Sequence, residues 1–301
     1  MKGLFLLILI SYLSNFFFKH DYFHNLLILI FGLFLFFKNL NILNLLKKNF
    51  LYSFIILISF LGIIIFKNHD DFFYYHFGYT LSLVNFTKLI GIGNFEHGFR
   101  TPSSIFYLNS LFYLPVIKYF MMHSGAIFFM IFSNFFLLEK IFISKNLNKN
   151  LFIVFLSILS FIFINTVFSR ISEHGTDRSA LILIFIFAII ILESLNNKNY
   201  NFENFKYYYN QILIVLFLII SLKVFYLIYL IFLIPWLYNY RKVLINFNNL
   251  RRILFNKFTL FFSCGLILII ITSFFNSGCL IYPASFTCLD NFSWSIQISE
   301  V

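Results

Sequence analysis

Long hydrophobic runs alternate with short polar segments along the whole chain, and the runs consist almost entirely of Phe, Ile and Leu. They cover residues 4–18, 25–37, 50–66, 104–121, 124–139, 151–168, 179–195, 208–221, 224–238 and 258–275. A helix needs about 17–25 residues to cross a bilayer, so several of these helices must extend into flanking Asn, Ser and Tyr. The pattern predicts an all-α, polytopic transmembrane bundle that forms a single membrane domain over residues 1–301.

The run from 208 to 238 is too long for one membrane crossing. A single straight helix of this length would measure about 46 Å, against a hydrocarbon core of about 30 Å. Lys223 also lies in its middle, where a Lys would cost at least about 2.5–3.5 kcal/mol. We therefore predict two spans that meet near residues 221–223.

The run from 104 to 121 decides the topology, because Asn109, Ser110, Pro115 and Lys118 make it a poor span. If it stays on one side as an interfacial or re-entrant helix, the positive clusters share the side of Lys2, as the positive-inside rule requires. These clusters are Lys38, Lys47, Lys48, Lys140, Lys145, Lys149, Lys198, Lys206, Arg241, Lys242, Arg251, Arg252 and Lys257. We predict about nine spans with the amino terminus in the cytoplasm and the carboxyl end outside.

Composition agrees with an integral membrane protein. Hydrophobic residues make up 61% of the chain and charged residues 11%, and the mean hydropathy is +0.90, far from the values of soluble domains. The net charge of +11 serves as a topology signal, so we expect the lipid bilayer rather than nucleic acid as its partner. No small-residue cleavage site follows the first run, which we interpret as an uncleaved span.

The predicted topology gathers the reactive side chains on the outer face, in loops at about 67–109, 169–178 and 276–301. All seven His residues lie on this outer face, although His20, His24 and His123 are outside these three loops. The same face carries Asp21, Asp70, Asp71, Glu96, Glu173, Asp177, Asp290 and Glu300. The inner loops are short and basic and contain no Gly-rich phosphate loop. This argues against a cytoplasmic enzyme that consumes ATP or a nucleotide sugar.

The first outer loop contains the candidate catalytic residues Asp70, Asp71 and His76. Ionisable groups at the mouth of a span are functional candidates, and one Asp could act as a general base towards an acceptor hydroxyl. The alternative is a solvated loop between two hydrophobic segments. Residues 77–91 suit a helix on the membrane surface, and Arg100 follows as a candidate phosphate ligand.

The second outer loop places Arg170, Glu173, His174, Asp177 and Arg178 within a few residues of one another. Its two Arg side chains could clamp a phosphate or pyrophosphate, with the other three as substrate-binding candidates. The alternative is a salt-bridge cluster that caps two helices. Lys223 is either a snorkelling side chain or a further phosphate contact.

Cysteines and metal ligands leave alternatives open. Cys279 and Cys288 lie in the last outer segment, where they either form a disulfide or remain free, and Cys264 lies within a span. A set such as Asp70, Asp71, His76 and His174 could hold a divalent cation, but no ligand spacing specifies a metal, so the cofactor is unknown.

A series of short motifs over residues 66–296 resembles an uncharacterised family of bacterial multi-spanning proteins from surface-polysaccharide gene clusters. The motifs are Asp70-Asp71 with Tyr74-Tyr75-His76, Gly91-x-Gly-Asn94, Gly98-Phe-Arg-Thr-Pro-Ser-Ser104, Ser221-Leu-Lys223, Ser277-Gly-x-x-x-Tyr-Pro283 and Asp290-Asn-Phe-Ser-Trp294. More distantly, the order of features is similar to the GT-C glycosyltransferases, which place an acidic residue in an early outer loop before an interfacial helix.

This resemblance implies an inverting transfer of sugar from a polyprenyl-phosphate carrier on the extracytoplasmic side, in surface polysaccharide or glycoconjugate synthesis. Asp70 or Asp71 would be the base, and Arg170, Arg178 or Lys223 would face the carrier phosphate. The acids follow the third predicted span rather than the first, and relatives generally continue for several more spans, which suggests a truncated member. Alternatives are a transporter or flippase of lipid-linked saccharide, a polymerase, and an inactive remnant.

Overall fold

The computed structural model describes residues 1–39, 71–143, 151–167, 171–197 and 200–301 of the chain. Regular structure within these ranges is helical, and the only β-type pairings among these residues are isolated bridges between Leu114 and Lys118 and between Cys279 and Cys288. The predicted all-α class is confirmed. The predicted run at 50–66 lies outside the described residues.

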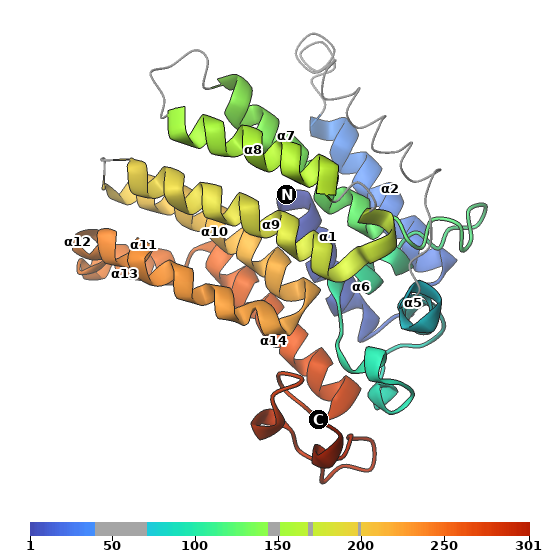
Figure 1. The fold of residues 1–301 in the computed structure, drawn as a ribbon. Helices are drawn as coiled ribbons and strands as arrows, with labels where there is room; N and C mark the ends of the chain where they lie inside the picture. Colours follow the sequence, from blue (N-terminus) through green and yellow to red (C-terminus); the bar gives the residue numbers. More distant parts are fainter. Residues whose placement is uncertain (40–70, 144–150, 168–170, 198–199) are drawn as a thin grey trace.

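Helices α7 to α11 lie side by side, with α12 and α13 at one end of this bundle and α5 and α6 at the other (Figure 1). In chain order the elements are α1 Lys2–Asn15, α2 Tyr22–Asn39, η1 Phe72–His76, α5 Phe77–Asn85, η2 Ile92–Asn94, η3 His97–Arg100, α6 Ser104–Ser110, α7 Gly125–Ile143, α8 Leu151–Val167, α9 Ile171–Asn196, α10 Phe202–Leu222, η5 Val224–Phe232, α11 Leu233–Asn239, α12 Arg241–Leu244, α13 Phe247–Leu254, α14 Lys257–Ser277, η6 Ser285–Thr287 and η7 Ile298–Glu300.

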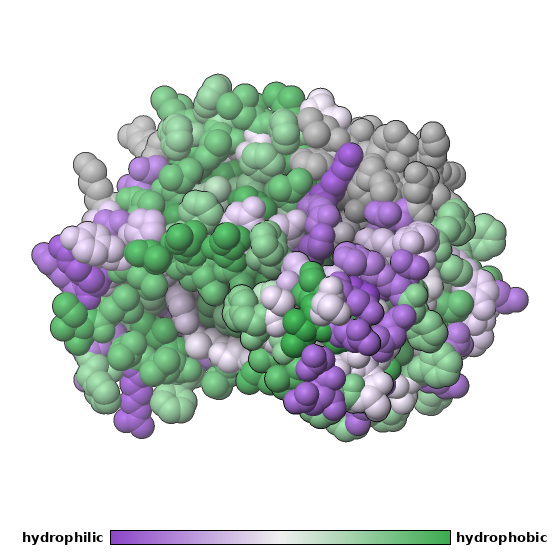
Figure 2. Space-filling view, turned by 60° about the horizontal axis from the view of Figure 1, so that its bottom comes forward, coloured by the Kyte–Doolittle hydropathy of each residue, from purple (hydrophilic) through white to green (hydrophobic). Residues whose placement is uncertain are grey.

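Four helical segments within the described residues are long and apolar enough to cross a membrane: Gly125–Phe142, Gly175–Asn196, Phe202–Leu222 and Lys257–Ser277. Shorter apolar helices occupy Lys2–Asn15, Tyr22–Lys38, Leu151–Thr166 and Val224–Asn239. The surface in Figure 2 is mostly hydrophobic, with hydrophilic residues gathered near the C-terminal segment and at the left edge, where Figure 1 places α12 and α13. These features are compatible with a membrane protein.

Helix α10 is the centre of the bundle. Every side chain from Ile212 to Leu222 is buried, as expected for a helix that is apolar on all sides. Phe217 packs its ring edge-on against Phe5 of α1, with ring centroids 4.7 Å apart. Because α10 also contacts α9 and α14, it sets the relative positions of most of the other helices.

The predicted break near residues 221–223 is confirmed. Helix α10 ends at Leu222, Lys223 is extended, and η5 begins at Val224. The chain then returns along the bundle, because Trp236 stacks on Phe205 near the start of α10, with ring centroids 5.0 Å apart. The Trp236 indole also donates a hydrogen bond of 2.8 Å to the Ser194 hydroxyl on α9.

Two segments, residues 104–121 and 169–178, differ in secondary structure from what the sequence pattern predicts. Residues 104–121 form only the seven-residue helix α6, which is buried along its whole length, followed by turns. The segment predicted as an outer loop at 169–178 is instead helical from Ile171 onward, with one non-helical residue at Gly175, where φ is +46°. Glycine adopts this left-handed conformation without steric cost, so the helix continues through the polar segment with a kink.

Candidate functional site

A cavity of about 240 Å³ lies where residues 71–109 of the first predicted outer loop, called here the first polar segment, meet α9 and the end of α10. The first polar segment contributes most of the lining, α9 contributes Thr176, and the end of α10 contributes Leu222 and the adjacent Lys223. The full set is Tyr75, His97, Gly98, Thr101, Ser103, Phe106, Thr176, Leu222 and Lys223. The polar segments that the sequence separates by about a hundred residues therefore share one concave site, of the kind that binds small ligands.

Lys223 supplies the positive charge of this cavity. Its ammonium group donates to both carboxylate oxygens of Asp177, at 3.0 and 3.1 Å, and the Tyr226 hydroxyl donates to the same carboxylate at 2.9 Å. Both ionic side chains are partly exposed to solvent, and an ion pair of this kind contributes little net stability. An anionic ligand in the cavity can therefore compete with Asp177 for the ammonium group.

Tyr75 lies in the same cavity, against the backbone of the first polar segment. A Cβ atom added to Gly98 would come within 2.2 Å of the Tyr75 ring, so the ring requires a glycine at this position. Burial raises the pKa of Tyr75 to about 12, and the negative charges of Asp71 and Asp177 act in the same direction. Tyr75 is therefore a hydrogen-bond donor at neutral pH. Its hydroxyl interacts electrostatically with one acidic residue from each polar segment, Asp71 and Asp177.

The C-terminal segment, residues 278–301, contacts the loop that lines the cavity. The Tyr282 hydroxyl and His97 Nε2 lie 2.8 Å apart and share a hydrogen bond. The Arg100 guanidinium forms an ion pair of 2.6 Å with the Glu300 carboxylate and donates to the carbonyl oxygens of Glu300 and Gly93. Arg100 is absent from the cavity lining, so its contacts fix the C-terminal segment to the loop that contains His97.

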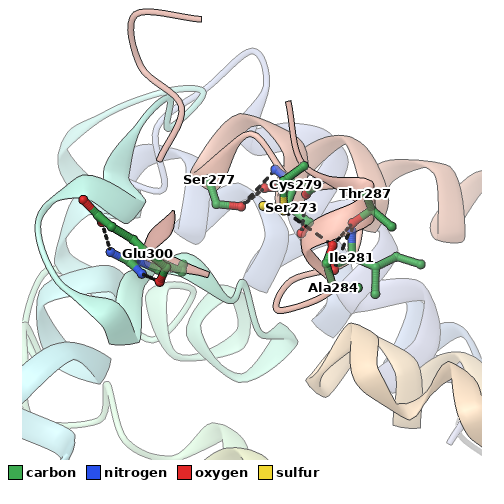
Figure 3. Close-up of a disulfide and its surroundings, with 9 residues drawn as sticks. Ser273, Ser277, Cys279, Ile281, Ala284, Thr287 and Glu300 are labelled. Atoms are coloured by element: carbon green, nitrogen blue, oxygen red, sulfur yellow. Dashed lines mark hydrogen bonds and ion pairs between the residues drawn. A yellow bond between two sulfur atoms is a disulfide. The ribbon is translucent and has the colours of Figure 1, made fainter. Parts of the chain in front are cut away.

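A disulfide between Cys279 and Cys288 closes this C-terminal segment, which settles the alternative that the sequence left open. Figure 3 shows the hydrogen bonds around it: the Ser273 hydroxyl donates to the Cys279 carbonyl, and the Cys279 amide donates to the Ser277 hydroxyl. Helix α14 ends at Ser277, and the φ of +83° at the following Gly278 allows the chain to turn into this segment. Cys264 is a free, exposed cysteine on α14.

The remaining predicted site residues lie around the cavity or outside the described part of the chain. Asp71 precedes η1 directly, and His76 is buried in η1, facing Gly175 and packed on Phe106 at a ring distance of 5.1 Å. Arg178 is half-buried on α9, close to Thr176 in the sequence.

Four predicted site residues lie wholly or in their side chains outside the described part of the structure. Glu173 and His174 belong to α9, and only their backbone is described, whereas Asp70 and Arg170 lie outside the described residues. No group of three or more His, Cys, Asp or Glu suited to a metal occurs among the described residues. The predicted Asp70–Asp71–His76–His174 set includes Asp70, which lies beyond that part of the chain.

Sequence reasoning gave no ligand role to Tyr75, His97, Thr101 or Thr176, which line the cavity. Tyr75, Thr101 and Thr176 lie inside segments that the sequence did single out, namely the Tyr-Tyr-His motif, the Gly-Phe-Arg-Thr-Pro motif and the polar start of α9, and His97 directly precedes the second motif. The sequence signal that could have identified these four lining residues was their position next to charged residues. Charge drew attention to Arg100, whereas its uncharged neighbour Thr101 reaches the cavity.

These features define a helical-bundle protein with a polar cavity beyond the end of its central helix α10. The chain belongs to a family described as "Domain of unknown function (DUF8201)", whose model matches residues 1–300. No curated protein and no solved structure matched the chain.

Proposed function

We propose that this chain is an integral membrane glycosyltransferase of the GT-C kind, which uses a polyprenyl-phosphate-linked sugar on the extracytoplasmic side of the bacterial inner membrane. The observation that supports this proposal is the single cavity in which Tyr75, Thr176 and Lys223 meet, with Asp71 next to it. An acidic residue, a cation and several hydroxyl groups around one concave site suit a phosphate-linked sugar.

The proposed membrane topology has about nine spans: the eight apolar helices of the described part and the run at 50–66. Helix α10 would cross the whole bilayer, because its 21 residues rise by about 30 Å. Its cavity end faces outward, with Arg241, Lys242, Arg251 and Arg252 at the cytoplasmic end. The Cys279–Cys288 disulfide supports this orientation, because disulfides persist in the periplasm.

In the proposed reaction, the acceptor hydroxyl oxygen attacks the anomeric carbon of the donor sugar as the bond from that carbon to the phosphate oxygen breaks. The acceptor proton passes to the Asp71 carboxylate, or to that of Asp70, acting as the general base. The polyprenyl phosphate leaves with the bonding electron pair, and Lys223 stabilises its negative charge. Tyr75 remains protonated and donates a hydrogen bond to the bound sugar or phosphate.

Lys223→Gln tests the phosphate contact. In purified protein reconstituted into nanodiscs and supplied with a panel of polyprenyl-phosphate hexoses and a glycan acceptor, we expect the native chain to release polyprenyl phosphate. Loss of a hydrogen bond to a charged group costs about 1.5–3 kcal/mol, so the variant should release it about 10–100-fold more slowly at limiting donor concentration.

Lys19→Gln is the matched control, because Lys19 is also a partly exposed Lys that pairs with an Asp, Asp21, at 3.6 Å. Lys19 does not line the cavity, so its variant should keep the native rate. Equal rates for Lys223→Gln and Lys19→Gln would contradict the assigned role of Lys223. Failure of the native chain to release polyprenyl phosphate from any donor of the panel would contradict the transferase proposal.

A further inference from the structure

A second polar pocket lies at the opposite end of the bundle from the cavity. This α10–α14 pocket measures about 510 Å³ and is formed by the first turns of α10 and α14 together with the end of α13. It is lined by Phe202, Glu203, Lys206, Asn210, Arg252, Phe255, Asn256, Lys257 and Phe258. Phe202 begins α10 and Leu222, which lines the cavity, ends it, so about 30 Å separates the two sites along this helix.

The pocket has an excess of positive charge that no carboxylate of the described residues neutralises through an ion pair. It contains the cations Lys206, Arg252 and Lys257 against one carboxylate, that of Glu203. Among the described residues, no carboxylate lies within ion-pair distance of these three cations, although four ion pairs occur elsewhere. The ammonium group of Lys2 also approaches, 5.8 Å from the Phe258 ring centroid. The positive dipole ends of α10 and α14 add to this field.

The walls of the pocket are fixed by contacts among the three helices. The Asn256 amide donates to the Asn210 side-chain oxygen, which joins the start of α14 to α10. The Thr259 hydroxyl donates to the Ile253 carbonyl at 2.7 Å, which joins α14 to α13. The cations therefore project from a preformed concavity, and a ligand does not have to assemble it.

The surroundings of the pocket are amphipathic. Helix α13 exposes Phe247, Leu250 and Leu254 beside the basic side chains of Arg251 and Arg252. A short helix with an apolar face and a basic face lies in the membrane interface, with the apolar side towards the acyl chains. Figure 1 places α13 at the end of the bundle where α10 begins, opposite the end of α10 that reaches the cavity.

We propose that the α10–α14 pocket binds the phosphodiester headgroup of an anionic phospholipid from the membrane leaflet opposite the cavity. The headgroup phosphate would lie between Lys206, Arg252 and Lys257, and the exposed Phe255 and the half-buried Phe258 would contact the glycerol and upper acyl region. Guanidinium and ammonium groups are the usual ligands of a phosphate diester, and the pocket volume suits a headgroup. The site needs the membrane placement of the chain but not its transferase activity.

The test is a thermal-shift titration of the purified full chain in a zwitterionic detergent. We expect phosphatidylglycerol to raise the unfolding midpoint in a saturable manner, because a ligand that binds only the folded state stabilises it. Phosphatidylcholine with the same acyl chains should give no saturable shift, and inorganic phosphate at the same concentration should give none. A full shift with inorganic phosphate would assign the pocket to a soluble phosphate and overturn the lipid proposal. An equal shift with phosphatidylcholine would show unspecific lipid binding and overturn it as well.

Two double variants locate the binding. Lys206→Gln/Arg252→Gln removes two cations of the pocket and should weaken the apparent affinity for phosphatidylglycerol about 30-fold, since each cation near an anionic headgroup contributes a factor of about five. Arg241→Gln/Lys242→Gln removes the same charges from α12, outside the pocket, and should keep the native affinity. Equal weakening by both variants, or by neither, would contradict a site in the α10–α14 pocket.

Discussion

Replacement of Asp71 by Asn is expected to slow sugar transfer by about 100- to 10,000-fold, the range that a positioned general base contributes. The amide keeps the shape of the carboxylate and removes only its ability to accept a proton. Asp71 directly precedes η1 and is partly exposed, and its negative charge raises the pKa of Tyr75, a lining residue of the cavity. The variant should therefore insert and fold as the native chain does. Release of polyprenyl phosphate by protein reconstituted in nanodiscs measures the effect.

Asp290→Asn is the control for this change, because Asp290 is an exposed aspartate of the C-terminal segment outside the cavity lining. Its rate should equal that of the native chain. Asp70→Asn, assayed in parallel, distinguishes the two adjacent carboxylates, since only the base should show the full loss. Native rates in both the Asp70 and the Asp71 variants would refute acid–base catalysis from this segment.

Gly265→Ala is expected to lower the stability of the helical bundle. A Cβ atom at this position would lie 2.2 Å from Cε2 of Phe217, whose ring is fully buried on α10 and packs on Phe5. Overpacking of this kind typically costs about 1–3 kcal/mol. Because α10 and α14 together form the walls of the α10–α14 pocket and α10 also reaches the cavity, a shift between them should disturb both sites. The midpoint of thermal unfolding in one detergent reports the change.

Gly32→Ala is the matched control: the same substitution at this position should not lower the stability of the bundle. Gly32 is also a helical glycine, but no atom would lie within 4 Å of its added Cβ. Alanine is favoured over glycine in a helix by up to about 1 kcal/mol, so this variant should be as stable as the native chain or more so. A Gly265→Ala variant that unfolds at or above the midpoint of Gly32→Ala would contradict the packing of α14 on Phe217.

The helical elements followed from the sequence because their signals are local. Apolar runs predicted most of the long helices, and the charge of Lys223 within one run correctly predicted the break between α10 and η5. One prediction from local polarity was wrong. The charged residues after Arg170 suggested a loop, but the chain is helical from Ile171. A helix that extends beyond the apolar region places such residues in a polar environment at no cost, which composition alone does not reveal.

The cavity depended on contacts that no local pattern contains. Thr101, Thr176 and Lys223 come from three distant parts of the chain, and only the packing of α6, α9 and α10 brings them together. Arg100 had the charge expected of a phosphate ligand, but its partner is Glu300, two hundred residues further on. The same holds for the hydrogen bond between His97 and Tyr282. Residue type predicted which segments meet at the site, while tertiary packing decides which side chains line it.

The claim on which the whole account depends is that the shared cavity opens to the outside of the membrane. The most direct measurement is labelling of Thr101→Cys, in a Cys264→Ser background, by a membrane-impermeant maleimide added to right-side-out spheroplasts. We expect rapid labelling that blocks release of polyprenyl phosphate, whereas Asn248→Cys on α13 should react only after the membrane is permeabilised. Protection of Thr101→Cys in intact spheroplasts together with labelling of Asn248→Cys would reverse the orientation and contradict the account.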